Sequence, residues 1–265
     1  MRTRRTHMRL LQLLFVVALL GLLPALAPIA QAQPATRIVY FPWVSNGETI
    51  GGQGPWTGVL SFQNRSDDFC ALQVFAGRDG AWVPTTQLSL TAGSSRSVSA
   101  SGLSVPSPGA PMRFQAGCDI VVSLKQYTPN VRTTPWSDGA RVVTGYTGLS
   151  EADIEAAHAT PTSAWFLPIV QTNSDWNTFI RVANLSETTA TSVRVDIYPS
   201  SNPDGVDGAV LTMQQNVGVA GSVTIDALAS LGSEFVGFAR ISAEEDIGVV
   251  ARRVKPGVML AISNV

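Results

Sequence analysis

Few side chains in this 265-residue sequence are His or Cys, the usual base and the thiol nucleophile of nucleophilic catalysis. The chain holds two His and two Cys, and His7 lies in an N-terminal segment that we expect to be removed. A catalytic Ser or Cys needs a neighbouring base, usually a His, and the remaining His158 follows an Ala-rich stretch. Gly-x-Ser-x-Gly, Walker-type and His-Glu-x-x-His motifs are absent. We therefore expect no enzyme, no catalytic residue and no cofactor.

Acidic residues leave two other kinds of chemistry open. A hydrolase could use paired carboxylates such as Asp67-Asp68 or Glu244-Glu245-Asp246, but both stretches are turn-like and their acids are interpreted as solvated loop residues. The segment 204–208 (Asp-Gly-Val-Asp-Gly) offers oxygen ligands of the kind that calcium takes. It supplies too few carboxylates by itself, so we interpret it as a hairpin loop and expect no metal site.

The first 32 residues have the pattern of a secretory signal peptide. Four Arg precede residue 10, an apolar stretch runs from Leu10 to Leu23, and Ala30-Gln31-Ala32 places small residues at a cleavage site. The apolar stretch ends at Pro24, short of the ~20 residues of a membrane span, although an uncleaved anchor stays open. We expect a secreted or cell-surface protein with no membrane span in the mature chain.

Composition excludes two further classes of protein. Removing four Arg from 18 basic residues leaves 14 against 19 acidic residues, a formal charge of −5. A nucleic-acid-binding protein would show a basic excess instead. The chain is 45% hydrophobic and only 14% charged, enough apolar residues to bury a core, so we do not expect a disordered protein.

The two cysteines, Cys70 and Cys118, are expected to form a disulfide. An exported chain enters a compartment where thiols oxidise, and two cysteines alone cannot make a zinc site with four Cys or His ligands. Two buried thiols that never meet are the alternative.

The sequence contains two copies of one unit. Trp56 to Ser66 matches Trp176 to Ser186, with Trp, Asn and Ser identical. Met112 to Pro129 aligns without a gap on Ala239 to Pro256, with six identities in eighteen positions. Such self-similarity indicates a repeated structural unit. Two shorter blocks match in the same order: 40–44 with 166–170, and 72–75 with 195–198.

Within each copy, apolar residues alternate with polar ones. Leu60 and Phe62 alternate with Val59, Ser61 and Gln63, the period that puts successive strand side chains on opposite faces. Turn-forming clusters of Gly, Pro, Asn, Asp and Ser separate these runs. We therefore predict an all-β chain of two antiparallel β-sandwiches, with seven or eight strands each.

The predicted boundaries follow from the repeat. Between the copies, Ser150 to His158 has a helical pattern with Ser150 as the N-cap. The predicted segments are a signal peptide (1–32), β-sandwich domain 1 (33–148), a linker with a short helix (149–163) and β-sandwich domain 2 (164–265).

Residues at equivalent places in the two copies are interpreted as structural. Asn64 and Asn184 also fit the N-glycosylation pattern, but both close a strand, so we expect each side chain to bond to its own turn. The equivalent pairs are Trp56 and Trp176, Asn64 and Asn184, Pro42 and Pro168, and Asp119 and Asp246.

Six Trp raise the possibility of carbohydrate binding, because an exposed ring can stack on a sugar. Trp56 and Trp176 are interpreted as packing, as is Trp43, which stands where Ile169 stands in the other copy. Trp82 and Trp136 have no partner in the other copy and lie near loops. They are the candidate ligand-contact residues.

The stretches Leu167 to Val170, Trp176 to Ser186 and Val193 to Tyr198 resemble those of secreted bacterial surface proteins built from tandem immunoglobulin-like β-sandwich modules. The resemblance covers most of the mature chain and implies a place at the bacterial envelope or exterior. It carries over no catalytic residue, because such modules serve many unrelated roles.

Together these features favour a non-enzymatic secreted or cell-surface protein that acts in envelope structure, adhesion or assembly. Exposed sheet edges would bind partners by strand addition. Expected partners are other envelope or surface proteins, or extracellular glycans, and not nucleic acid; the oligomeric state stays open. The alternatives are a carbohydrate-binding module pair and a hydrolase that uses loop carboxylates.

Overall fold

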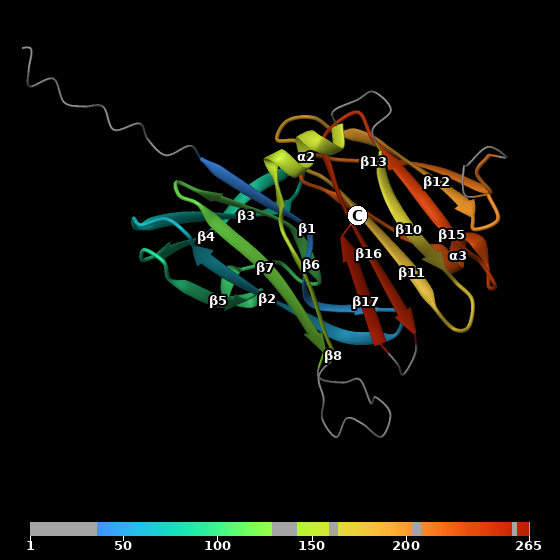
Figure 1. Cartoon of the computed structure of the whole chain (residues 1–265), viewed down its shortest axis with the longest axis horizontal. Coiled ribbons are helices and arrows are strands. Elements are labelled where there is room, and N and C mark those ends of the chain that lie inside the picture. Colours follow the sequence, from blue (N-terminus) through green and yellow to red (C-terminus); the bar gives the residue numbers. More distant parts are fainter. Residues whose placement is uncertain (1–35, 129–141, 159–163, 203–207, 256–258, 265) are drawn as a thin grey trace, which may run out of the picture. The chain divides into compact units, whose positions relative to one another are not determined.

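The structure, a computed structural model, describes residues 36–128, 142–158, 164–202, 208–255 and 259–264. The expected signal peptide therefore lies outside the described residues. The described chain consists mainly of antiparallel β-strands (Figure 1), which confirms the predicted all-β class. Residues 35–265 form one compact unit, and the division into two separate domains stays a prediction.

The first half of this unit contains two sheets, and β1 passes from the first sheet into the second. Sheet A has the order β4-β3-β6-β1 and sheet B the order β5-β2-β7-β8. Residues 37–45 of β1 pair with β6, and residues 46–50 pair with β2. The strands are β1 (Arg37–Ile50), β2 (Gln53–Asn64), β3 (Cys70–Arg78), β4 (Ala81–Leu90), β5 (Ser95–Ser99), β6 (Gly109–Ala116), β7 (Ile120–Thr128) and β8 (Val142–Thr147), with a 3-10 turn at Ser101–Leu103.

The second half repeats this strand order. Sheet C has the order β13-β12-β15-β10 and sheet D the order β14-β11-β16-β17, so each strand has a counterpart in the first half, as the sequence duplication predicts. The strands are β10 (Trp165–Gln171), β11 (Asn177–Asn184), β12 (Thr191–Pro199), β13 (Leu211–Val217), β14 (Ser222–Asp226), β15 (Val236–Ser242), β16 (Ile247–Lys255) and β17 (Met259–Asn264), with the helix α3 at Ala227–Leu231.

Each pair of sheets encloses an apolar core. Leu60 and Phe62 of β2 are fully buried, whereas Ser61 between them is only partly buried, which is the alternation that the sequence predicts. Ile180 and Val182 of β11 are the buried counterparts in the second half. Burial of an aliphatic or aromatic side chain stabilises a fold by roughly 1.5–3 kcal/mol, so these alternating residues hold the sheets of each pair together.

Pro42 and Pro168 occupy equivalent bulges. The pairing of β1 with β6 shifts between Phe41 and Val44, and the pairing of β10 with β15 shifts between Leu167 and Val170. Proline cannot donate to a ladder and is tolerated where the ladder is interrupted. In the first half, the strand continues past this bulge into sheet B.

One block of the sequence alignment needs a correction. Val74 lies opposite Phe114, and Val195 lies opposite Ile241, and these two partners are equivalent in the gapless match of 112–129 with 239–256. Val74 therefore corresponds to Val195, so the match of 72–75 with 195–198 was wrong by two residues. Because strands alternate every second residue, a shift of two preserves the apolar pattern and cannot be detected from it.

The predicted disulfide is present. Cys70 at the start of β3 is bonded to Cys118 in the turn between β6 and β7, with 5.6 Å between the two Cα atoms. Both residues are buried in the core of the first half. The bond therefore closes a loop that contains four strands, β3, β4, β5 and β6.

The predicted linker is partly built into the fold. β9 (Leu149–Ser150) pairs with β1, and the helix α2 (Glu151–His158) follows it. Ser150 and Asp153 form a reciprocal cap, in which the Ser150 hydroxyl accepts from the Asp153 amide and the Asp153 carboxylate accepts from the Ser150 amide. Ile154 is buried in the core of the second half. No helix in the described part of the chain is long and apolar enough to cross a membrane.

Removing the disulfide should destabilise the protein substantially. The bond closes a loop of about 49 residues, for which the chain-entropy model gives about 4 kcal/mol. We expect the double variant Cys70→Ala/Cys118→Ala to lose about that much free energy of unfolding in a urea titration. Equal unfolding midpoints for variant and parent would show that the bond does not contribute to stability.

Candidate functional site

The carboxylate of Glu48 is the buried charged group on which side chains of both halves converge. It lies in the part of β1 that has left sheet A for sheet B, and only 4% of the residue is exposed. Burial of a carboxylate is costly unless it is paired and hydrogen-bonded. The groups that pair with this carboxylate therefore indicate its role.

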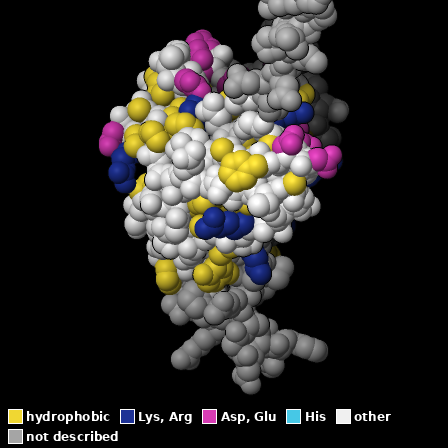
Figure 2. All heavy atoms as spheres, turned by 90° about the vertical axis from the view of Figure 1, so that its left-hand side faces the viewer, with side chains coloured by type: hydrophobic (Ala, Val, Ile, Leu, Met, Phe, Trp, Pro, Cys, Tyr) yellow, Lys and Arg dark blue, Asp and Glu magenta, His cyan; other side chains and the backbone are white. Residues whose placement is uncertain are grey.

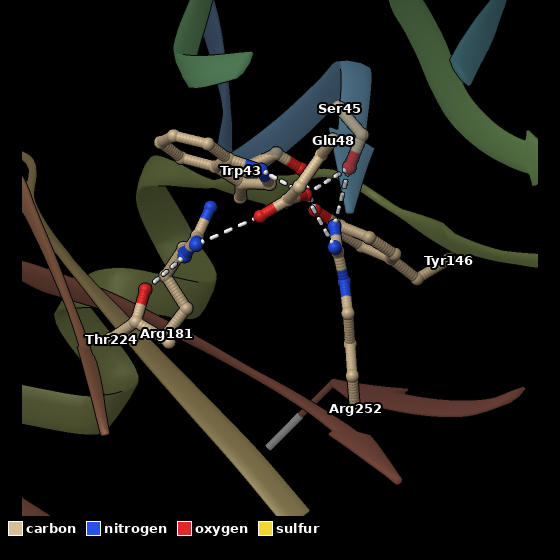
Figure 3. Close-up of polar contacts among 7 residues, drawn as sticks. All are labelled: Trp43, Ser45, Glu48, Tyr146, Arg181, Thr224 and Arg252. Atoms are coloured by element: carbon tan, nitrogen blue, oxygen red, sulfur yellow. Dashed lines mark hydrogen bonds and ion pairs between the residues drawn. The ribbon is translucent and has the colours of Figure 1, made fainter. Parts of the chain in front are cut away.

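Two arginines from the second half bind this carboxylate from different strands (Figure 3). Arg252 of β16 donates from Nη1 to Oε2 at 2.7 Å, and Arg181 of β11 approaches Oε1 with its Nη2 at 2.9 Å. Arg252 is 3% exposed, so this ion pair is almost completely removed from water. The two halves are thus joined through both oxygens of one side chain.

Groups of the first half fix the carboxylate in place. Trp43 donates its indole N–H to Oε2 at 2.7 Å, and the Ser45 hydroxyl also donates to Oε2. Ser45 in turn accepts from Nη2 of Arg252 at 3.0 Å, and the Tyr146 hydroxyl donates to the carbonyl of Trp43. The Arg181 guanidinium lies over the Trp43 ring, 3.5 Å from its centre, a cation–π arrangement.

The electrostatics keep Glu48 ionised. Burial alone would raise the pKa of Glu48, but the charges of Arg252 and Arg181 and the hydrogen bond from Ser45 outweigh it, so the pKa lies below its ordinary value of 4.5. Burial lowers the pKa of Arg181 to about 10, against the opposing charge of Glu48. A carboxylate held in this way is a poor proton acceptor, so the arrangement suits attachment rather than acid–base catalysis.

The outer face of sheet D explains how the arginines reach Glu48. Every residue from Ile247 to Arg252 in β16 is buried, without the alternation of a half-exposed strand. Val249 belongs to the core of the second half, whereas Val250 belongs to the core of the first half. Further along, Val254 packs with Ile50 and Trp56. This face of sheet D is therefore a contact surface with the first half, which we call the joint.

A pocket of about 170 Å³ lies beside the joint and includes Glu48, Phe179, Arg181, Thr224 and Arg252 in its lining. Arg181 also donates from Nε to the Thr224 hydroxyl at 2.7 Å. Its Nη1 atom is buried and has no hydrogen-bond partner among the described protein atoms. No cluster of three or more His, Cys, Asp or Glu in the described part of the chain is arranged to hold a metal ion.

A second contact joins the halves at the outer face of sheet A. Arg113 of β6 is 7% exposed and donates from Nη1 to Oε1 of Glu187, in the loop after β11. The Arg113 guanidinium also lies 4.1 Å from the centre of the Phe75 ring. Burial raises the pKa of the nearby Tyr40 to about 12, against the lowering effect of Arg113. Here the first half supplies the arginine and the second half the carboxylate, the reverse of the ion pairs at the joint.

Of the two candidate ligand-contact tryptophans, the structure describes Trp82. Trp82 is half-buried, lies 5.9 Å from Tyr40 between ring centres, and packs against the core of the second half. It is therefore part of the contact between the halves and does not stand free in solvent. Trp136 lies outside the described residues.

The equivalent tryptophans have different surroundings. Trp56 is completely buried beside Val254 in the joint. Trp176 is partly exposed and has the Arg253 guanidinium 5.3 Å from its ring centre. The first residue contributes to packing between the halves, whereas the second borders a loop.

Asn64 and Asn184 hold equivalent turns. Both residues are completely buried. The Asn64 amide donates to the carbonyls of Asp68 and Thr91, and its Oδ1 accepts from the Ser66 amide. Asn184 forms the same set of bonds with Thr189, Val217 and Ser186. These side chains point inward and bond to their own turns.

Asp119 and Asp246 also have equivalent positions, in the turns that precede β7 and β16. Their backbone carbonyls accept from the amides of Arg65 and Leu185, both at 2.8 Å. The Asp119 side chain is exposed and lies 3.7 Å from Arg65. Asp67, Asp68 and Glu244 are exposed loop residues. Asp204 and Asp207 lie outside the described residues, and His158 is the last residue of α2.

Sequence reasoning missed Glu48, Arg181 and Arg252. A signal existed for Arg181, because Ser61 stands at the equivalent position of the first copy, so that only the second copy has a charge there. Arg252 gave no such signal, because its equivalent Lys125 is also basic. Trp43, which replaces Ile169, is another residue that differs between the copies.

No family model, curated protein or solved structure matches this chain.

Neutralising Glu48 should weaken the joint severely. Glu48→Gln keeps the shape but leaves Arg181 and Arg252 buried without their counter-charge, which costs about 3–5 kcal/mol. The matched control is Asp119→Asn, which removes an exposed pair worth about 0–1 kcal/mol. Urea unfolding of the three proteins measures both effects, and equal losses in the two variants would contradict a role for burial.

Acid should reduce the contribution of Glu48. Because its pKa is lower in the folded protein, its stabilising effect is present above the ordinary value of 4.5 and is lost as pH falls through the folded pKa. The gap in free energy of unfolding between the parent and Glu48→Gln should therefore narrow below pH 4.5. Urea titrations from pH 7 to pH 3 measure this gap, and a constant gap would rule out ionisation of Glu48 as its source.

Proposed function

We propose that the chain is an exported, non-enzymatic protein of two tandem immunoglobulin-like β-sandwich modules, which acts in envelope structure, adhesion or assembly. The repeated strand order, the disulfide and the signal-like N-terminus support this proposal. The joint at Glu48 supports it further, because it fixes two modules in one unit that can present binding surfaces with a set spacing. The proposed mode of action is strand addition at a sheet edge.

The observation that carries the proposal is the edge of sheet C formed by β13. Its seven residues, Leu-Thr-Met-Gln-Gln-Asn-Val, include no charged residue and no proline. β12 pairs with one side of β13, and no described strand pairs with the other. Proteins usually protect such edges with charges, proline or short strands, because an exposed ladder pairs with other chains. An unprotected edge is the feature that strand addition requires.

The other described edges are protected in the usual ways. β4 carries Pro84 and β10 carries Pro168. β5 and β14 have five residues each and contain Arg96 and Asp226. β8 lies against β17. The partner that fits the edge of β13 is an extended, uncharged segment of another exported protein.

Proline substitution at two adjacent residues tests this edge. In an antiparallel pair, successive N–H groups point alternately to the neighbouring strand and away from it. One of Gln214→Pro and Gln215→Pro should therefore lose a bond to β12 and melt at a lower temperature. The other should keep its melting temperature and lose only the outward donor, which makes the two variants controls for each other.

Binding is measured by photo-crosslinking on intact producing cells, from a photoreactive residue placed at Asn216. We expect a crosslinked neighbour with the parent, and its loss in the proline variant that keeps its melting temperature. A photoreactive residue at Gln87 in β4 gives the background. Unchanged crosslinks in both proline variants, or a pattern shared with Gln87, would refute strand addition at β13.

A further inference from the structure

The contact at the outer face of sheet A is directional. The face of the first half supplies Arg113 and Tyr40, each 7% exposed. The second half supplies loops at the end of its sandwich: Glu187 precedes β12 and pairs with Arg113, and Ala220 precedes β14. The Ala220 carbonyl lies so close to Gly77 that a side chain at Gly77 would collide with it. A sheet face of one module thus binds the loop end of the next.

The corresponding face of the second half is open. Phe166 and Arg240 occupy the places of Tyr40 and Arg113, and each pair lies opposite in its own ladder. Phe166 is 55% exposed, whereas Tyr40 is 7% exposed. Phe238 packs against Phe166 and Tyr198, with ring centres 5.3 and 5.0 Å apart. Soluble proteins seldom expose a row of aromatic side chains across three strands without a use for it.

The corresponding loop end of the first half is open as well. Asp67 follows Asn64 by three residues, as Glu187 follows Asn184, so the acid of the contact is repeated. Gly93 corresponds to Ala220, and both have positive φ, +63° and +51°. Phe69 in the same loop end is 65% exposed. The face and the loop end that remain open therefore match the two surfaces that are already in contact.

Charge and apolar character are complementary between these open surfaces. Among described residues, the outer face of sheet C carries Arg194 and Arg240 against one acid, Asp196. The loop end carries Asp67 and Asp68 next to Phe69, and Arg65 of the same loop is paired with Asp119. Figure 2 shows the molecule from the side of β4 and β5, where hydrophobic, acidic and basic side chains stand among mostly uncharged ones. An acidic loop with an exposed ring fits a basic face on which Phe166 is exposed and Tyr198 and Phe238 are partly exposed.

The aromatic row is less suited to a glycan. Sugar binding by stacking needs an exposed ring face. Tyr198 and Phe238 lie nearly parallel, at 12°, and stack on each other, so each covers a face of the other.

We infer that the outer face of sheet C binds the loop end of the first half of a second copy of this chain, so that copies associate head to tail. Such a contact is heterologous, and one that does not close by rotation produces an open chain. The inference rests on the proposed function in assembly and names the partner. The surface differs from the edge of β13, so the two can fail separately.

Two variants, each altered on one of the two proposed contact surfaces, test the inference. Phe166→Glu places a charge in the aromatic row, and the double variant Asp67→Lys/Phe69→Ser alters the loop end. All three positions are exposed loop or surface residues, and melting curves should confirm that both variants fold. Sedimentation velocity of the purified parent should show a mass that rises with concentration beyond the dimer. Each variant alone should bind itself at least about tenfold more weakly.

Mixing the two variants gives the decisive result. Each retains one intact surface, so an equimolar mixture should form a 1:1 dimer and nothing larger. Val121→Ser, an exposed change on sheet B, should assemble like the parent. A parent that stays monomeric at high concentration overturns the inference, as does a mixture that stays monomeric or a Phe166→Glu variant that still assembles alone.

The same experiments separate this inference from the proposed function. The proline variant of β13 that keeps its melting temperature should assemble like the parent. If self-assembly fails while Asn216 still crosslinks to another protein, the head-to-tail contact is wrong and strand addition stands. If self-assembly occurs and Asn216 crosslinks to no protein other than a second copy of this chain, strand addition at β13 is wrong and the head-to-tail contact stands.

Discussion

The arrangement of the two halves depends on one carboxylate shared by two arginines. Glu48 is buried, and the arginines that neutralise it come from two strands of the other half. A buried ion pair seldom stabilises more than an apolar replacement would, because desolvation offsets much of the attraction. What it adds is discrimination: an apolar contact tolerates sliding, whereas a displaced Glu48 would leave three charges buried without partners. The joint therefore favours one arrangement of the halves by making others costly.

Duplication explains why such a joint needs so few residues. Both halves use the same strand order and the same turn-forming asparagines, so each folds by the same rules. Some of the differences between the copies lie where the halves meet. On sheet D, Arg181 stands where the first half has the smaller Ser61, and Arg252 stands where it has the exposed Lys125. In addition, β1 continues beyond its bulge into sheet B, where Glu48 lies. The specific features of the protein thus arise from departures from a repeat that otherwise sets the fold.

Much of this fold could be predicted from the sequence because its causes are local. Alternation at Leu60 and Phe62, the cap at Ser150 and the pairing of the two cysteines follow from neighbouring residues and the compartment. The joint could not be predicted from the sequence, because it depends on which outer sheet faces of the two halves meet. The sequence of β16 shows that the strand is largely apolar, but it does not show that Val249 and Val250 belong to different cores. Trp82 was placed near a loop, and only the fold shows that it packs beside Tyr40.

The contact at sheet A has a geometric consequence that the joint lacks. A symmetric contact between identical modules uses the same patch twice and is complete with two modules. Here the first half contributes a face and the second half contributes a loop end, so the corresponding face of the second half and the corresponding loop end of the first half lie outside this contact. That face carries Arg240 at the place of Arg113, and that loop carries Asp67 at the place of Glu187. Drift would be expected to replace such residues with unrelated ones, whereas a surface that still makes the same contact would keep their charges.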